Sequence, residues 1–105
     1  MGGNMNESIY SIEKIKNIVV PVLKQHKVKK AVLFGSYAKQ CATEHSDIDI
    51  YIDSGGVLNG LNFFTVYNDI ESCLNKKVDL IEALDIDKGS KIHDEITEYG
   101  VILYE

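Results

Sequence analysis

The sequence predicts a small α/β domain in which helices pack on a mixed β-sheet of about four strands. Segments with a helical spacing of apolar residues alternate along the chain with short segments that are typical of strands. The chain has 105 residues, of which 45% are hydrophobic and 26% charged, and these values suit one globular domain. We therefore expect a single domain over residues 1–105, with any disorder confined to the ends, such as residues 1–7.

The first segment, up to about residue 25, is predicted to be an amphipathic helix. Its apolar residues recur at steps of three and four: Ile9, Ile12, Ile15, Val19, Val22 and Leu23. Ser8 or Asn6 could cap its N-terminus. Pro21 lacks an amide hydrogen, and its ring crowds the carbonyl four residues earlier, so we expect it to kink this helix or divide it in two.

Two strands, with a helical turn between them, are predicted next. Residues 28–34 form a short apolar segment that ends at Gly35, which predicts a buried strand, and residues 36–40 are expected to form a helical turn. Residues 47–53 alternate strictly, which predicts a half-buried strand. One face of this strand carries Ile48, Ile50 and Ile52, and the other carries Asp47, Asp49, Tyr51 and Asp53.

The next helix and strand bring a further carboxylate. Residues 61–75 have roughly helical spacing, and either Asn59 or Asn62 could cap the helix. Residues 77–81 predict a short apolar strand. On that strand Asp79 points away from its apolar neighbours.

One more helix and strand close the chain. A helix is predicted over residues 87–99, where Ile92 and Ile96 are four residues apart, and Gly100 supplies the stop signal expected just past a helix. Residues 101–104 form the last predicted strand. This order favours one sheet covered by helices, and it leaves open which strands are neighbours.

Composition and charge exclude several classes of protein. The formal net charge of −5 argues against a general nucleic-acid binder, because such proteins place clustered Lys and Arg against phosphates. Cys41 and Cys73 lack the spacing of a redox or zinc site, so we expect free thiols in a reducing cytoplasm. No apolar run reaches the ~18 residues that a membrane span requires, which predicts a cytoplasmic protein with no membrane partner.

Three aspartates are the candidate metal ligands. Asp47 and Asp49 are separated by one residue on a predicted strand, so they share a face, with Cα atoms roughly 6 to 7 Å apart. Such carboxylates can converge on hard divalent cations, and two cations ~3.5 to 4 Å apart can clamp a phosphoryl group. Asp79 is the best candidate for the third ligand. Alone, an Asp-x-Asp pattern more often marks the solvated face of a strand.

A glycine-serine pair strengthens the functional interpretation. Gly35 and Ser36 lie where a predicted strand ends and a helical turn begins. Glycine lets backbone amides approach a phosphate closely, and amides at the start of a helix favour anions. The alternative is an ordinary turn glycine followed by an N-cap serine.

Together these residues resemble a known motif. Residues 35–40, Gly-Ser-Tyr-Ala-Lys-Gln, followed by residues 46–49, Ser-Asp-Ile-Asp, are similar to the GSxARG…SDxD signature of minimal nucleotidyltransferases. These proteins belong to the DNA polymerase beta-like superfamily. Residues 78–80 resemble the strand that carries the third carboxylate of that family, and residues 99–105 resemble its usual ending. The resemblance covers nearly the whole chain and implies the nucleotidyltransferase fold.

The resemblance implies a nucleotide site. Gly35 and Ser36 would hold the triphosphate of ATP, with the Ser36 hydroxyl on a terminal phosphate. Lys39 and Ser46 would complete the nucleotide contacts. The usual arginine and glycine of the family are Lys39 and Gln40 here. Lysine lacks the planar fork of arginine, and Gln40 restricts a turn that glycine leaves open, so weaker binding or a degenerate site is an alternative.

The resemblance also implies the reaction. Asp47, Asp49 and Asp79 would bind two Mg²⁺ ions, with Mn²⁺ as the alternative. Asp79 would lower the pKa of the acceptor hydroxyl or take its proton. The acceptor oxygen would then attack the α-phosphorus of ATP, and pyrophosphate would leave.

Minimal members of this family are often antitoxins whose partner is a HEPN-domain ribonuclease toxin, and they attach AMP to a tyrosine of that toxin. We therefore expect AMP transfer from ATP to a tyrosine of a HEPN-type partner. One alternative is a noncatalytic antitoxin that inhibits its partner by contact alone, and another is transfer to a small molecule such as an aminoglycoside. The shortness of the chain favours a second chain that completes the cleft, as a homo- or hetero-oligomer.

Overall fold

The computed structural model describes residues 9–83 and 86–105, in which four helices and a four-stranded mixed sheet are present. The elements are α1 (Ile12–Gln25), β1 (Lys30–Phe34), α2 (Gly35–Ala38), β2 (Ile48–Asp53), α3 (Leu61–Leu74), β3 (Val78–Glu82), α4 (Lys91–Tyr99) and β4 (Val101–Tyr104). The predicted α/β class and the sheet of about four strands are confirmed. The prediction for residues 1–7 falls outside the described residues.

The strand order settles which strands are neighbours. The strands lie in the order β3-β2-β1-β4. β1 runs antiparallel to both β2 and β4, whereas β2 and β3 are parallel. A parallel pair needs a long crossover, and α3 supplies it between β2 and β3. The two strands on which the candidate aspartates were predicted are therefore adjacent.

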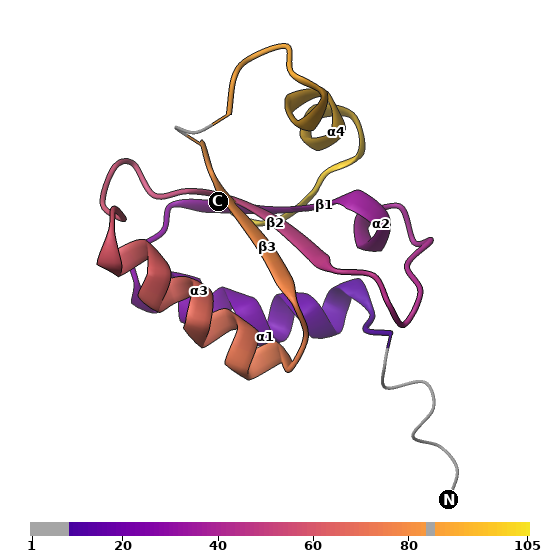
Figure 1. Cartoon of the computed structure of the whole chain (residues 1–105), viewed down its shortest axis with the longest axis horizontal. Helices are drawn as coiled ribbons and strands as arrows, with labels where there is room; N and C mark the ends of the chain where they lie inside the picture. Colours follow the sequence, from indigo (N-terminus) through magenta and orange to yellow (C-terminus); the bar gives the residue numbers. More distant parts are fainter. Residues whose placement is uncertain (1–8, 84–85) are drawn as a thin grey trace, which may run out of the picture.

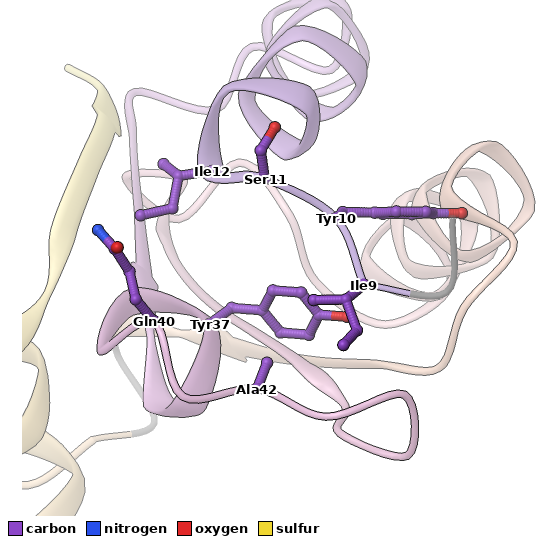
Figure 2. Close-up of a pocket in the computed structure, with 7 residues that line it drawn as sticks. All are labelled: Ile9, Tyr10, Ser11, Ile12, Tyr37, Gln40 and Ala42. Carbon is purple, nitrogen blue, oxygen red and sulfur yellow. The ribbon is translucent and has the colours of Figure 1, made fainter. Parts of the chain in front are cut away.

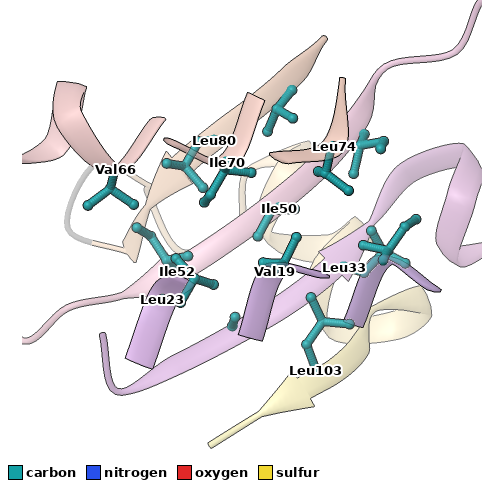
Figure 3. Close-up of a cluster of buried hydrophobic side chains, with 14 of the residues drawn as sticks. Val19, Leu23, Leu33, Ile50, Ile52, Val66, Ile70, Leu74, Leu80 and Leu103 are labelled. Atoms are coloured by element: carbon teal, nitrogen blue, oxygen red, sulfur yellow. The ribbon is translucent and has the colours of Figure 1, made fainter. Parts of the chain in front are cut away.

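The hydrophobic core fills the space between one face of the sheet and the helices α1 and α3, which lie side by side on that face (Figure 1). Figure 3 shows the side chains that meet there, among them Val19, Leu23, Leu33, Ile50, Ile52, Val66, Ile70, Leu74, Leu80 and Leu103. The isoleucines of β2 are fully buried in this core, as the alternating pattern predicts. A shift of one residue would turn them away from it, so their burial fixes which face carries the aspartates.

The start of α1 differs from the prediction. Helix α1 begins at Ile12, because Ser11 is its N-cap and the Ser11 hydroxyl accepts a hydrogen bond from the Lys14 amide at 3.0 Å. The predicted caps, Ser8 and Asn6, lie outside the described residues.

Pro21 does not divide α1 in two, so that part of the prediction is wrong. The helix continues without interruption through Pro21 for 14 residues. Pro21 and the residue one turn before it, Asn17, are both exposed. Water can therefore solvate the carbonyl that loses its hydrogen-bond partner, which makes the proline tolerable here.

Two other helix starts were also predicted wrongly. The N-cap of α3 is Gly60, which makes no side-chain cap hydrogen bond, so neither Asn59 nor Asn62 caps it. Helix α4 begins after residue 90 rather than at residue 87, because Ser90 is the N-cap and its hydroxyl accepts a hydrogen bond from the His93 amide at 3.2 Å.

A buried pair of polar side chains ties β2 and β3 together at their C-terminal ends. The Ser54 hydroxyl donates a hydrogen bond of 2.6 Å to Glu82, and the Ser54 amide donates a second to the same carboxylate at 3.3 Å. Both residues are almost fully buried, so each satisfies the other away from water. This pair anchors one end of the parallel strands, while the aspartates lie toward the other.

Two class predictions can be compared with the structure. Cys41 and Cys73 are free thiols, as predicted, and the structure shows that both are exposed. Among the helices of residues 9–83 and 86–105, none has the length and apolar character needed to cross a membrane.

Candidate active site

The three predicted aspartates lie on the sheet face that points away from the core. Asp47 directly precedes β2, Asp49 is in β2, and Asp79 is in β3. The parallel register pairs Asp49 with Asp79, so the two carboxylates project from neighbouring strands on one face. Asp47 and Asp79 are exposed, whereas Asp49 is half-buried. The structure thus brings together two aspartates that are 30 residues apart in the sequence.

The surroundings of Asp49 make its negative charge costly. Burial is the largest cause that raises the pKa of Asp49 to about 6, and the charges of Asp79, Asp47 and Glu95 contribute to this shift in that order. Its cross-strand neighbour on β1 is the buried Phe34. A divalent cation would neutralise this concentration of negative charge, so the site favours cation binding.

The three carboxylates suit a hard divalent ion, although their side chains do not already converge on one point. Within the described parts of the chain, no three His, Cys, Asp or Glu side chains already form a group that could hold a metal. Like charges repel one another when no cation lies between them, and the exposed Asp47 and Asp79 side chains can rotate. Carboxylate oxygens are the ligands that Mg²⁺ prefers, and the shared face and register allow the three residues to fit it.

Gly35 lets the chain pass close to Asp49. It has a φ of +74°, which is in the left-handed region, and a Cβ atom at this position would overlap the Asp49 carboxylate oxygen Oδ2. Any larger residue would therefore meet both backbone strain and a steric conflict. The turn between β1 and α2 consequently lies directly against the central aspartate, with Ser36 half-buried next in the chain.

Lys39, predicted to contact the nucleotide, is held by α4. Its ammonium lies 2.9 Å from Glu95 Oε1 and 4.8 Å from the centre of the Tyr99 ring. The hydrogen bond to Glu95 raises the pKa of Lys39 above its ordinary value. The other oxygen, Glu95 Oε2, is buried without a hydrogen-bond partner.

Glu95 is the residue near the site that sequence reasoning missed. It contributes to the negative potential at Asp49 and binds the side chain of Lys39. The sequence placed Glu95 and Tyr99 four residues apart on a predicted helix, which puts them on one face. Nothing in that spacing indicated that this face packs beside α2, because the contact joins segments 56 residues apart.

Ser46 and Gln40 shape the backbone on either side of the loop that precedes β2. The Ser46 hydroxyl accepts a hydrogen bond from the Thr43 amide at 2.9 Å, and the Ser46 amide donates to the Thr43 carbonyl at 3.1 Å. Ser46 therefore closes a turn that delivers Asp47 to β2. Gln40 has a φ of +60°, so it occupies the left-handed region that glycine adopts more easily, as the departure from the motif suggested.

Neutralising Glu95 is expected to tighten ATP binding. In Glu95→Gln, Lys39 loses its anionic partner and the site loses one negative charge, so we expect the Kd for MgATP to fall about fivefold. Isothermal titration calorimetry would measure the change. Glu98→Gln, on the exposed surface of the same helix, is the control and should bind ATP as the wild type does. Weaker binding in Glu95→Gln would instead show that Glu95 holds Lys39 in its working position.

A separate cavity of about 340 Å³ lies between the start of α1 and the segment around α2 (Figure 2). Its lining includes Ile12, Tyr37 and Gln40, and none of the three aspartates borders it. The Tyr37 side chain is almost fully buried, and its hydroxyl has no hydrogen-bond partner. This cavity is therefore distinct from the carboxylate site.

Comparison with known proteins places the chain in a family. Residues 13–105 match the family model described as polymerase beta, nucleotidyltransferase. Two proteins of Methanocaldococcus jannaschii that carry the provisional name protein adenylyltransferase are similar to it. One is 38% identical over 68% of this chain and 76% of its own length, and the other is 37% identical over 73% and 94%.

Solved structures agree with this fold. A toxin–antitoxin structure with AMP-PNP matches with a TM-score of 0.74 at 23% identity, over 85% of this chain and 72% of that one. A tri-AMPylated Shewanella oneidensis HEPN toxin in complex with an MNT antitoxin matches with a TM-score of 0.69 at 21% identity, over 88% and 71%. With the family model spanning nearly the whole chain, this protein belongs to the polymerase beta nucleotidyltransferase family.

Proposed function

We propose that this nucleotidyltransferase moves AMP from ATP to a hydroxyl group in a reaction that depends on divalent metal. The observation that carries the proposal is the shared sheet face on which Asp47, Asp49 and Asp79 lie, with Asp49 against the turn at Gly35. A phosphoryl group bound there would have carboxylates on one side and a close backbone turn on the other. The names of the similar proteins from Methanocaldococcus jannaschii support adenylyl transfer to a protein.

In this proposal the residues around α2 bind the triphosphate. Gly35 lets the backbone come close to the phosphates, and the Ser36 hydroxyl donates a hydrogen bond to a terminal phosphate oxygen. Lys39 exchanges its contact with Glu95 for the phosphates. Ser46 lies at the edge of the same region and fixes the loop that carries Asp47.

The three aspartates hold the metal in this proposal. Asp47, Asp49 and Asp79 are the proposed ligands of two Mg²⁺ ions, which Mn²⁺ could replace. Such ions, when bound, neutralise the charge that develops on the phosphoryl oxygens. Asp79 also accepts the proton of the acceptor hydroxyl. It is on the edge strand β3, where an acceptor can approach from outside the sheet.

The proposed acceptor is a tyrosine of a HEPN-type toxin, which makes this chain the antitoxin of a pair. One structural neighbour is an MNT antitoxin in complex with a HEPN toxin that is itself tri-AMPylated, and this supports both the partner and the modification. The structure with AMP-PNP supports ATP as the donor.

A noncatalytic antitoxin is the second candidate, and one observation favours it. Lys39, the cation expected at the phosphates, is paired with Glu95 rather than free. Gln40 in turn adopts a backbone conformation better suited to glycine. A chain whose site had decayed in this way could still silence a partner by binding to it.

Labelled ATP, Mg²⁺ and a HEPN-domain partner distinguish the two candidates. We expect metal-dependent label on a tyrosine of the partner, and its loss in Asp47→Asn/Asp49→Asn. Both substitutions keep side-chain shape and remove charge, and Asp47 is exposed, so the fold should persist. A complex that forms without label, in the wild type as in the mutant, would favour the noncatalytic antitoxin. Label on an aminoglycoside instead would identify a small-molecule acceptor.

A further inference from the structure

An aromatic groove opens beside the carboxylate site. It has a volume of about 500 Å³ and lies between α3 and the edge strand β3. Phe63, Phe64 and Tyr67 contribute its aromatic wall, and Asp47 and Asp79 border it as well. The groove is thus continuous with two of the three candidate metal ligands.

The groove lies on the side of the aspartates opposite to the proposed phosphate turn. Gly35 follows β1, Asp79 is in β3, and β2 with Asp49 lies between them. In phosphoryl transfer the attacking and leaving oxygens are roughly in line across the phosphorus. If pyrophosphate leaves toward Gly35, the attacking hydroxyl must enter from the side of Asp79, where the groove opens.

The aromatic wall of the groove is partly exposed and is held in place by its neighbours. Phe64 is 57% exposed, and its ring stacks on that of Tyr67 with centroids 6.2 Å apart. The Tyr67 hydroxyl donates a hydrogen bond of 2.8 Å to Glu71, which also accepts one from the Val78 amide at 3.0 Å. Tyr67 is therefore fixed to the start of β3, and its ring supports the exposed ring of Phe64.

We infer that this groove is where the proposed acceptor tyrosine binds, with its ring against the aromatic wall of α3. The inference rests on the proposed AMP transfer. An aromatic ring between Phe64 and β3 would stack on the exposed wall, with its hydroxyl directed toward Asp79. Leu61, one helical turn before Phe64, is 83% exposed, so the apolar surface extends past the groove and can contact the protein around the tyrosine.

The transfer requires no reactant other than ATP and the tyrosine. The tyrosyl oxygen forms a bond to the α-phosphorus of ATP, and the bond from that phosphorus to the oxygen bridging to the β-phosphate breaks. Pyrophosphate leaves with the electron pair of that bond. The phenolic proton passes to Asp79 and from there to solvent.

N-acetyl-tyrosinamide is the probe that tests the groove. With labelled ATP and Mg²⁺, Phe64→Ala is expected to raise the KM for N-acetyl-tyrosinamide about threefold to tenfold and to leave the KM for ATP unchanged. Phe64→Tyr keeps the ring and should restore binding. Ile102→Ala is the matched control, because Ile102 is 50% exposed on the opposite edge strand and should have no effect on either KM.

Amide chemical shifts of the full chain separate the groove from the reaction. Titration with N-acetyl-tyrosinamide should shift residues 63–67 and 78–80 in the wild type and much less in Phe64→Ala. Shifts confined to other elements, or an unchanged acceptor KM in Phe64→Ala, would overturn the inference. A raised KM for ATP alone would overturn it too, by assigning the groove to the nucleobase. Shifts at the groove without AMP transfer to N-acetyl-tyrosinamide or a HEPN partner would support the groove and contradict the proposed function.

Discussion

Asp49→Asn is expected to abolish AMP transfer and, at the same time, to stabilise the metal-free protein. Loss of the central carboxylate removes a proposed ligand from the point where the phosphoryl group is transferred, so we expect the rate to fall by about a thousandfold. The gain in stability has a separate cause, which is the burial of Asp49 beside Asp79 and Asp47. A residue kept for function at the expense of stability is typical of active sites.

The pKa of Asp49 determines whether Asp49→Asn gains or loses stability at a given pH. The pKa of Asp49 is about 6 in the folded chain, above the ~3.9 of an unperturbed aspartate, so the folded state holds the proton more tightly than the unfolded state. The stabilisation that the protonated Asp49 gives the folded state is fully present below pH ~4 and is lost as the pH rises through about 6. Because Asp49 is only partly buried, we expect the free energy of unfolding of Asp49→Asn to exceed that of the wild type by only about 1 kcal/mol above pH 6.

Urea denaturation in EDTA at several pH values would measure this effect. The wild type should lose stability between pH ~4 and ~6, whereas Asp49→Asn should lose less. Asp79→Asn is the matched control, because it removes a neighbouring charge without removing the buried group, and its gain should be smaller. A mutant that is less stable than the wild type at pH 7.5 without metal would contradict our account of Asp49.

Gly35→Ala is expected to disrupt both the fold and the reaction. The new Cβ would overlap the Asp49 carboxylate, and alanine disfavours a φ of +74° by roughly 1 kcal/mol or more. We expect the free energy of unfolding to fall by about 2 to 3 kcal/mol and the transfer rate to fall at least about a hundredfold, because Asp49 must move. Chemical denaturation and the labelled-ATP assay would measure the two effects.

Gly56→Ala separates backbone strain from steric overlap. Gly56 has a φ of +86°, similar to that of Gly35, but no atom lies within 4 Å of a Cβ placed there. The Gly56→Ala variant should therefore lose about 1 kcal/mol of stability and keep its transfer activity. Equal losses of stability in the two variants, with activity retained in both, would show that the approach of Gly35 to Asp49 has no functional role.

The sequence contained most of the information about the fold. The strict alternation over residues 47–53 predicted which side chains of that strand enter the core, and the structure buries Ile48, Ile50 and Ile52 as expected. Strand periodicity is a local property, so it can be read from neighbouring residues. The helix starts were harder to predict, since several residues near each start can act as an N-cap, and the structure selects Ser11 and Ser90.

The candidate site divides in the same way. The Asp-x-Asp pattern, the glycine-serine turn and the apolar strand around Asp79 could be recognised in the sequence as parts of a nucleotidyltransferase motif. The parallel register that places Asp79 beside Asp49 could not, because strand order depends on long-range pairing. The Lys39–Glu95 ion pair was also invisible, since it joins elements that meet only in the folded chain.

By itself, the sequence determined the types of the elements, the faces that enter the core and the residues that we propose as cation ligands. Only the tertiary structure decided that β3 lies beside β2, that Glu95 lies near Asp49, and that an aromatic groove opens next to Asp79. The physical reason is that local patterns record the burial of each segment, whereas a site is formed by contacts between segments far apart along the chain.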